Sequence, residues 1–239
     1  MSSPRHRLEV DAAALAGLTG RGVAVAIIDS GVNGDHPHVE HVAGGVRIEL
    51  SGECTDDFVD RLGHGTAVFA AIQEKAPASK LHAVRVFDDK LSTSTRALVS
   101  AIDWAAEKSV TLANLSLGTP KAGHAEPLAE AVARLGAGGG VVVAAAESDG
   151  QRWWPGSLNT TIGVVMDPGC PRDCVELRGD SFAASPYPRP IPGVPPERNL
   201  NGISFAVANV TGLLARLLEG VQGPHTAEGI LERFRDAAG

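Results

Sequence analysis

The sequence predicts an α/β protein, a single-domain three-layer sandwich with a mainly parallel, doubly wound sheet. Two observations favour it. Short apolar runs alternate with helical patterns along the chain, and several of these runs are apolar at nearly every position. Strands have this composition when helices cover both faces of a parallel sheet. Neither an internal repeat nor a low-complexity linker interrupts the 239 residues, so we expect one domain over 1–239.

The expected strands are short runs rich in β-branched residues, in chain order 23–28, 81–86, 111–117, 141–146 and 161–165. The expected helices repeat apolar residues at one-turn spacing. They span 95–106, 128–135, 207–218 and 227–237. Residues 92–94 offer N-caps for the first helix. Glycines in 136–140 end the second helix, and the third ends near Gly220. The proline-rich stretch 186–196 is expected to be an ordered loop, because it lies between elements of one apparent core.

Composition and charge exclude several classes of protein. The net charge is −7, from 28 acidic and 21 basic residues, so no basic footprint for nucleic acid is present. Apolar runs stay below the roughly 18–20 residues of a membrane helix, which predicts no membrane partner. The basic N-terminus lacks a following apolar stretch, so we expect a cytoplasmic protein. Cys54, Cys170 and Cys174 do not suggest a disulfide framework. Cys170 and Cys174 are close enough to bridge or to share a metal, but two reduced thiols in a loop are the simpler expectation.

Three short motifs contain residues whose side chains can take part in catalysis. Asp29 ends the first expected strand, where open α/β sheets place their sites, although a structural carboxylate is common there. His64 lies in a glycine turn that opens a helix, and a structural histidine is the simpler reading of it alone. Ser204 follows Gly202 at the start of a buried helix, where it is either a helix cap or a nucleophile beside free N–H groups.

Taken together, these three residues form a coherent mechanism. A serine hydroxyl becomes nucleophilic when a base removes its proton, and an imidazole oriented by a carboxylate is the usual base. Asp29, His64 and Ser204 supply these groups in the chain order Asp, His, Ser. The positive end of the helix dipole at Ser204 favours an oxyanion. The motifs therefore indicate acyl transfer through a serine.

The motifs resemble those of the subtilases, the subtilisin-like serine peptidases. The resemblance covers roughly 22–220 and rests on 29–31, 63–66, 114–118, 154–156 with 162–164, and 202–206. It implies a subtilisin-like fold and a serine endopeptidase acting on peptide or protein substrates. Asp29, His64 and Ser204 would form the catalytic triad. Ser116, Leu117 and Gly118 would run beside the bound peptide, and Trp153 and Trp154 either line the cleft or pack beneath it. The stretch 186–196, with Arg189 and Arg198, either forms a wall of the cleft near Ser204 or is a rigid connector.

The strand end that resembles the family's oxyanion segment departs from its pattern. After Ala146, this chain has Glu147 where the family has Gly, and Ser148 where it has the oxyanion Asn. We expect Ala146, Glu147 and Ser148 to belong to the oxyanion and substrate-binding region, with Ser148 or a neighbouring group donating to the oxyanion. A hydroxyl can donate but reaches less far than an amide. Glu147 would favour a basic residue before the scissile bond, or else point away or pair with Arg152.

Only 28 residues precede Asp29, so we expect a compact form without a prodomain, suited to selective intracellular processing. Two alternatives remain open: a peptide-binding pseudo-protease, and a ligase or cyclase using the same acyl-enzyme. The polar cluster of Asp35, His36, His38, Glu40 and His41 is expected to be a solvated loop rather than a metal site. We expect no cofactor; the resemblance allows structural calcium without assigning ligands, and the oligomeric state stays open.

Overall fold

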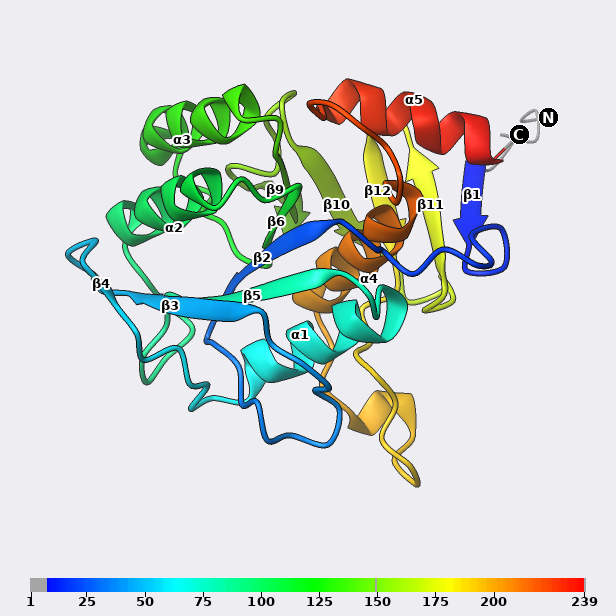
Figure 1. Ribbon diagram of the computed structural model, residues 1–239, viewed down its shortest axis with the longest axis horizontal. Coiled ribbons are helices and arrows are strands. Elements are labelled where there is room, and N and C mark those ends of the chain that lie inside the picture. Colours follow the sequence, from blue (N-terminus) through cyan, green and yellow to red (C-terminus); the bar gives the residue numbers. More distant parts are fainter. Residues whose placement is uncertain (1–7, 149, 239) are drawn as a thin grey trace.

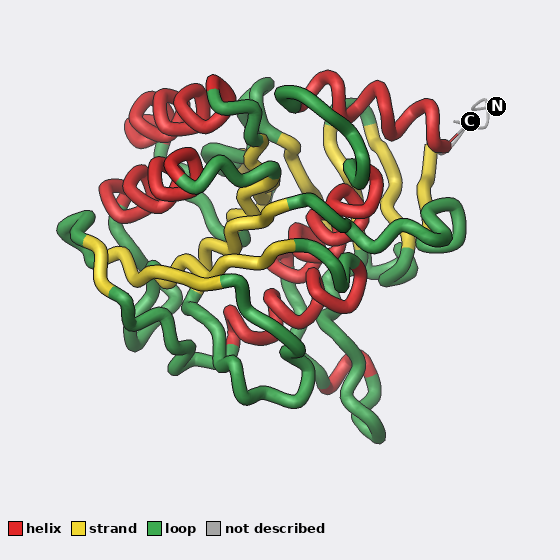
Figure 2. The backbone as a smooth tube through the Cα atoms, in the orientation of Figure 1, coloured by secondary structure: helices red, strands yellow, loops and turns green. Residues whose placement is uncertain are grey.

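A ten-stranded sheet covered by helices on both faces forms the core of the computed structural model (Figures 1 and 2), which describes residues 8–148 and 150–238. The strands of this sheet are β1 (Leu8–Asp11), β2 (Ala24–Asp29), β3 (Gly44–Ile48), β4 (Cys54–Thr55), β5 (Lys80–Arg85), β6 (Leu112–Leu115), β7 (Val141–Ala145), β10 (Ile162–Met166), β11 (Cys174–Arg178) and β12 (Ser181–Ala184). A separate hairpin pairs β8 (Glu147–Ser148) with β9 (Gln151–Arg152). The helices are α1 (His64–Lys75), α2 (Thr95–Glu107), α3 (Ala125–Ala137), α4 (Ile203–Leu217) and α5 (Ala227–Ala238), with 3₁₀ turns η1 (Ala122–His124) and η2 (Pro196–Arg198).

The centre of the sheet is parallel. Its strand order is β1-β11-β12-β10-β7-β6-β2-β5-β3-β4, and the strands from β12 to β3 run parallel to one another. Antiparallel strands close both edges, β1 and β11 at one and β4 at the other. The predicted mainly parallel α/β sheet is therefore confirmed.

Helices form the two outer layers of the sandwich. In Figure 1, α2 and α3 lie together on one side of the sheet, and α1, α4 and α5 belong to the other layer. α4 is apolar nearly all round because it contacts α1 as well as β6, β7 and β10. Gly212 allows α1 and α4 to approach closely, since a Cβ there would lie 2.8 Å from the Lys75 side chain.

Several element boundaries differ from the sequence prediction. The strand expected at 111–117 ends at Leu115, and the one expected at 141–146 ends at Ala145. The helix expected at 128–135 extends to Ala137. It therefore includes Gly136 and ends two residues later than predicted. The helix expected at 207–218 starts at Ile203, which places Ser204 inside its first turn. The loop expected at 186–196 is confirmed, with a single 3₁₀ turn at its end.

The parallel arrangement brings three segments to one edge of the sheet. Asp29 is the last residue of β2, Ser116 directly follows β6 and Ala146 directly follows β7. β7, β6 and β2 are neighbours, so their carboxyl ends meet. Open α/β sheets bind ligands in the crevice outside these ends.

We expect Gly156→Ala to destabilise the fold by about 3 kcal/mol, because overpacking at a rigid contact typically costs this much. A Cβ on Gly156 would lie only 2.0 Å from the carbonyl oxygen of Ala145, at the end of β7. Gly136→Ala is the matched control: nothing lies within 4 Å of its Cβ position, and alanine favours the helix. Urea unfolding measures both; equal stability of the two variants would contradict the expectation.

Candidate active site

Asp29 and His64 form a buried carboxylate–imidazole pair. The Asp29 side chain is fully buried, and its Oδ1 lies 2.7 Å from Nδ1 of His64. The backbone N–H of Ser30 donates to the same oxygen, also at 2.7 Å. His64 is the first residue of α1, which begins after Gly63 adopts a left-handed φ of 79°. This arrangement fixes the proton on Nδ1 and leaves Nε2 available as a base.

Asp60 organises the turn that leads into α1. Its carboxylate accepts hydrogen bonds from Oγ of Ser30 (2.8 Å), from both the hydroxyl (2.6 Å) and the N–H of Thr66 (2.8 Å), and from the N–H groups of Leu62 and Gly63 (2.9 Å each). Burial raises the pKa of Asp60, but these hydrogen bonds outweigh it and hold the pKa below its ordinary value. This role of Asp60 was not predicted from the sequence, although its position just before the glycine turn was a signal for it.

Ser204 lies at the start of α4, directly against the end of β6. Gly202 precedes the helix with a φ of 151°, a backbone conformation that favours glycine. The Ser204 hydroxyl donates to the carbonyl of Ser116 (3.2 Å), while the Ser116 hydroxyl donates to the carbonyl of Ser204 (3.4 Å). The Phe205 ring packs 5.6 Å from the His64 ring. The hydroxyl of Ser204 therefore has to rotate before it can give its proton to His64, as is common in ligand-free sites.

Two buried polar side chains hold this junction together. Nδ2 of Asn114 donates to Oγ of Ser116 (2.9 Å), and the Thr211 hydroxyl contacts Oδ1 of Asn114 (2.9 Å). Asn114 lies in β6 and Thr211 in α4, and both are fully buried. Their roles were not predicted, although a polar residue inside an otherwise apolar strand or helix was a signal for a buried network.

A cleft of about 630 Å³ contains His64 and Ser204 in its walls. The predicted substrate-binding residues Ser116, Leu117 and Gly118 line it, as does Trp153. A Cβ on Gly118 would lie 3.2 Å from the Trp153 ring, so the ring packs against this glycine. The remaining walls include Phe87, Leu91, Leu98 and Ile203. The cleft is thus largely apolar. Trp153 lines it, whereas Trp154 packs against the apolar cluster between the sheet and the helices α2 and α3.

Ala146 and Glu147, which were expected in the oxyanion and substrate-binding region, do not line this cleft. Glu147 and Ala146 line a different cavity, of about 470 Å³, together with Arg152. Glu147 is exposed and faces Arg152 across the β8–β9 hairpin. The side chain of Ser148 lies outside the described part of the structure. The assigned roles of Glu147 in specificity and of Ser148 in the oxyanion hole therefore remain predictions.

We expect activity to fall below a pH set by His64. Burial lowers the pKa of His64, but the hydrogen bond and charge of Asp29, with the charge of Asp60, outweigh burial and raise this pKa above its ordinary value. A protonated imidazole cannot act as a base, so activity is lost as the pH falls through the raised pKa. The acid limb of kcat/KM against pH should have its midpoint above about 6.5. A midpoint at or below that value would contradict the assignment.

The cysteines and a possible metal site were the other candidates from the sequence. The three cysteines are free; Cys54 is exposed and Cys170 and Cys174 are buried, Cys174 at the start of β11 rather than in a loop. Burial raises the pKa of the Cys174 thiol to about 12. Over residues 8–148 and 150–238, no group of three or more His, Cys, Asp or Glu side chains is placed to hold a metal ion. Within the same ranges no helix is both long and apolar enough to cross a membrane.

The chain is similar to several known proteins. The model of the subtilase family matches residues 20–166, more than half of the chain, which include Asp29 and His64 but not Ser204. A subtilisin of Bacillus pumilus is 32% identical over 225 residues, covering 84% of this chain and 78% of that protein. Subtilisin E of Bacillus subtilis (strain 168) is 31% identical, covering 84% of this chain and 57% of that protein.

One further relative and one solved structure are also similar to this chain. The membrane-bound transcription factor site-1 protease of Homo sapiens is 34% identical over 181 residues, covering 73% of this chain and 16% of that protein. The crystal structure of a cold adapted subtilisin-like serine proteinase matches with a TM-score of 0.70 at 24% identity, covering 91% of this chain and 82% of that one. The predicted subtilisin-like fold is confirmed.

Proposed function

Because this chain belongs to the subtilase family of serine-type endopeptidases, we propose that it hydrolyses peptide bonds through an acyl-enzyme on Ser204. The observation that carries the proposal is the pairing of His64 Nδ1 with the buried Asp29 carboxylate at 2.7 Å, in a cleft whose walls also contain Ser204. Neither a structural histidine nor a helix-capping serine would require these groups to share one cleft.

The proposed mechanism assigns one task to each residue. Nε2 of His64 takes the Ser204 proton as Oγ attacks the substrate carbonyl, and later gives this proton to the leaving amine. Asp29 holds the imidazole in the required tautomer and stabilises its charged form. Water then attacks the acyl-enzyme by the same route, and Ser204 regains its proton as the acid product leaves.

The oxyanion would be held mainly by the start of α4. The first N–H groups of a helix have no partner within the helix, and the dipole favours negative charge there. The N–H of Ser204 belongs to this set. Ser148 is the proposed second donor, in place of the Asn of the family. Loss of one such donor in subtilisin lowers kcat by about 10²–10³, so we propose a slower enzyme suited to selective processing of peptides in the cytoplasm.

The test combines covalent labelling with product analysis. The purified protein is treated with a fluorophosphonate probe and read by intact mass, and a mixture of synthetic peptides is incubated with it and read by mass spectrometry. We expect one label per chain and products whose summed mass exceeds the substrate by one water.

The alternatives give different results in the same experiment. Products lacking the added water, formed with an amine or from a circularised peptide, would indicate a ligase or cyclase. A folded protein that binds peptides but is neither labelled nor active would contradict the proposal and indicate a pseudo-protease.

A further inference from the structure

A second cavity, of about 640 Å³, adjoins the turn that leads into α1. Its walls come from three segments that are far apart in the chain: loop 33–38, residues 60–70 and loop 188–200. In Figure 1 the two loops project from the same side of the molecule, below α1. The walls include Gly63, which directly precedes His64, and Leu200, four residues before Ser204. The cavity therefore adjoins the residue next to His64, which itself lines the cleft.

We propose that this second cavity, the leaving-side cavity, binds an apolar side chain in the half of the peptide that departs as the amine, and favours a carboxylate beside that side chain. The inference rests on the proposed function, because it needs a peptide held across His64 and Ser204. It adds a binding site and a substrate preference that the catalytic residues themselves do not determine.

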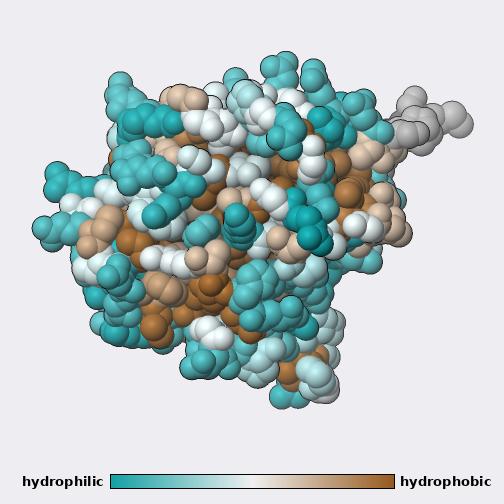
Figure 3. All heavy atoms as spheres, viewed as in Figure 1, coloured by the Kyte–Doolittle hydropathy of each residue, from teal (hydrophilic) through white to brown (hydrophobic). Residues whose placement is uncertain are grey.

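Apolar side chains give the cavity its first preference. Leu62, Ile191 and Leu200 line it and remain 37%, 45% and 51% exposed. Figure 3 shows hydrophobic surface on the projecting loop at the lower right of the molecule. Proteins expose such side chains at a cost in hydration free energy, which a bound apolar group would recover. A side chain of leucine size fits the cavity volume.

Two guanidinium groups give the second preference. Arg61 and Arg189 line the cavity together with His36 and His38, and the carboxylate among its described lining residues is Asp60. Both oxygens of Asp60 already accept hydrogen bonds from the turn before α1. A carboxylate on the substrate would therefore meet the two guanidinium groups, while the carboxylate among the described lining residues is already occupied by hydrogen bonds.

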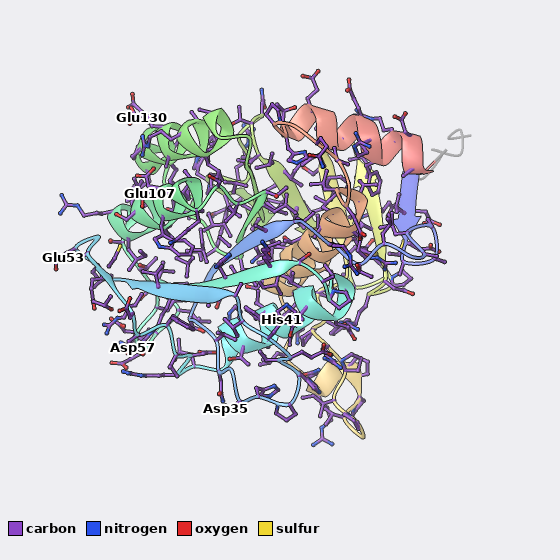
Figure 4. The ribbon with its side chains drawn as sticks, in the orientation of Figure 1. Asp35, His41, Glu53, Asp57, Glu107 and Glu130 are labelled. Carbon is purple, nitrogen blue, oxygen red and sulfur yellow. The ribbon has the colours of Figure 1, made fainter. Side chains whose placement is uncertain are left out.

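The two arginines share their carboxylate partners with other cationic side chains. Arg61 pairs with Asp57 at 2.8 Å, but Asp57 also pairs with Arg85 at 3.0 Å. Arg189 lies 4.0 Å from Glu74, which Arg172 contacts more closely. Each carboxylate thus serves two guanidinium groups. Asp35 and Asp57, labelled in Figure 4, lie at the lower side of the molecule but do not line the cavity.

The position beside His64 assigns the cavity to the departing half of the peptide. The acyl half stays bonded to Ser204, in the cleft lined by Ser116 and Gly118. The departing amine receives its proton from His64. A chain that continues from this amine past His64 reaches Gly63 and the first turns of α1, which form one wall of the leaving-side cavity.

An acyl-transfer experiment separates this inference from the proposed function. A thioester of an N-blocked tetrapeptide ending in Phe acylates Ser204 and releases its thiol, with no peptide on the leaving side. Ala-Leu-Asp-amide, Ala-Gly-Asp-amide or Ala-Leu-Lys-amide then competes with water for the acyl group, forming an amide bond. We expect transfer to Ala-Leu-Asp-amide to exceed that to Ala-Gly-Asp-amide about tenfold, the value for burying a leucine side chain, and that to Ala-Leu-Lys-amide about threefold.

Two surface variants test the wall of the cavity. Ile191→Ser and Leu200→Ser should each reduce the Leu-over-Gly ratio to about threefold or less, because half-exposed side chains lose only part of their burial. Met166→Ser is the matched control: Met166 is 48% exposed, lies at the end of β10 and does not line this cavity, so the ratio should stay near tenfold.

The outcomes distinguish failure of the proposed function from failure of the leaving-side cavity. A thioester that is not hydrolysed at all would contradict the proposed function. A thioester that is hydrolysed, with equal transfer to all three amides or with equal ratios in the Ile191→Ser and Met166→Ser variants, would overturn the leaving-side cavity and leave the proposed function in place.

Discussion

Ser204→Ala is expected to abolish fluorophosphonate labelling and to lower kcat for peptide hydrolysis by about 10⁶, the loss that follows removal of the serine from the triad of subtilisin. Without Oγ no acyl-enzyme can form. The residual rate would come from water attacking a carbonyl held beside the N–H groups of α4. The measurement is a progress curve with a quenched fluorescent peptide, together with intact mass after labelling.

The fold should survive this substitution. The Ser204 hydroxyl donates to the Ser116 carbonyl, and the Ser116 hydroxyl still bonds to the backbone of residue 204 in the variant. Ser51→Ala, in the exposed turn between β3 and β4, is the matched control and should keep full labelling. If the Ser204→Ala variant is labelled as well as the parent, another residue is the nucleophile and the proposed mechanism is wrong.

Asp29→Asn is expected to lower kcat by about 10³–10⁴ with little change in KM. A unit charge about 4 Å away at an effective dielectric constant of about 20 contributes about 4 kcal/mol, which corresponds to about 10³, and loss of the correct tautomer adds to it. The Asp29 charge also raises the pKa of His64, so the acid limb of the pH profile should move to lower pH in the variant. A merely structural carboxylate would not shift that limb.

The control for this substitution is Asp236→Asn, which removes the same charge from an exposed position on α5. It should leave kcat and the pH profile unchanged. If Asp29→Asn lowers activity only in proportion to a loss of folded protein, measured by urea unfolding, Asp29 is a structural residue and not part of the catalytic machinery.

The sequence could predict the central sheet because its strands are continuous apolar runs. β6 and β7 bury every residue, β2 buries five of its six, and β5 and β10 bury most of theirs. It could not predict β1, β3, β11 and β12, which are short and lack such runs. β11 includes Glu176 and Arg178 and pairs with β1, more than 160 residues earlier. The glycines of β3 argue locally against a strand.

The catalytic candidates could be predicted because each lies in a short motif with a local turn signal. The role of Asp60 could not be predicted, because residues 56–60 contain three acidic residues and resemble a solvated loop. Only the fold brings Ser30 and Thr66 to its carboxylate. The leaving-side cavity could not be predicted from the sequence either, since loops 33–38 and 188–200 meet only in the folded structure.

The proline-rich loop before Ser204 has a consequence for self-digestion. Six prolines occur in 186–196, and much of this loop is exposed beside the active site of the same molecule. A peptide bound in a protease cleft is extended and offers its N–H groups as donors, whereas proline has no N–H and fixes φ near −65°. The loop is also tied down, since Asn209 donates to the carbonyls of Ser185 and Tyr187. A second copy of the enzyme therefore meets in this loop a segment that fits an extended binding cleft poorly, which protects the loop from autolysis.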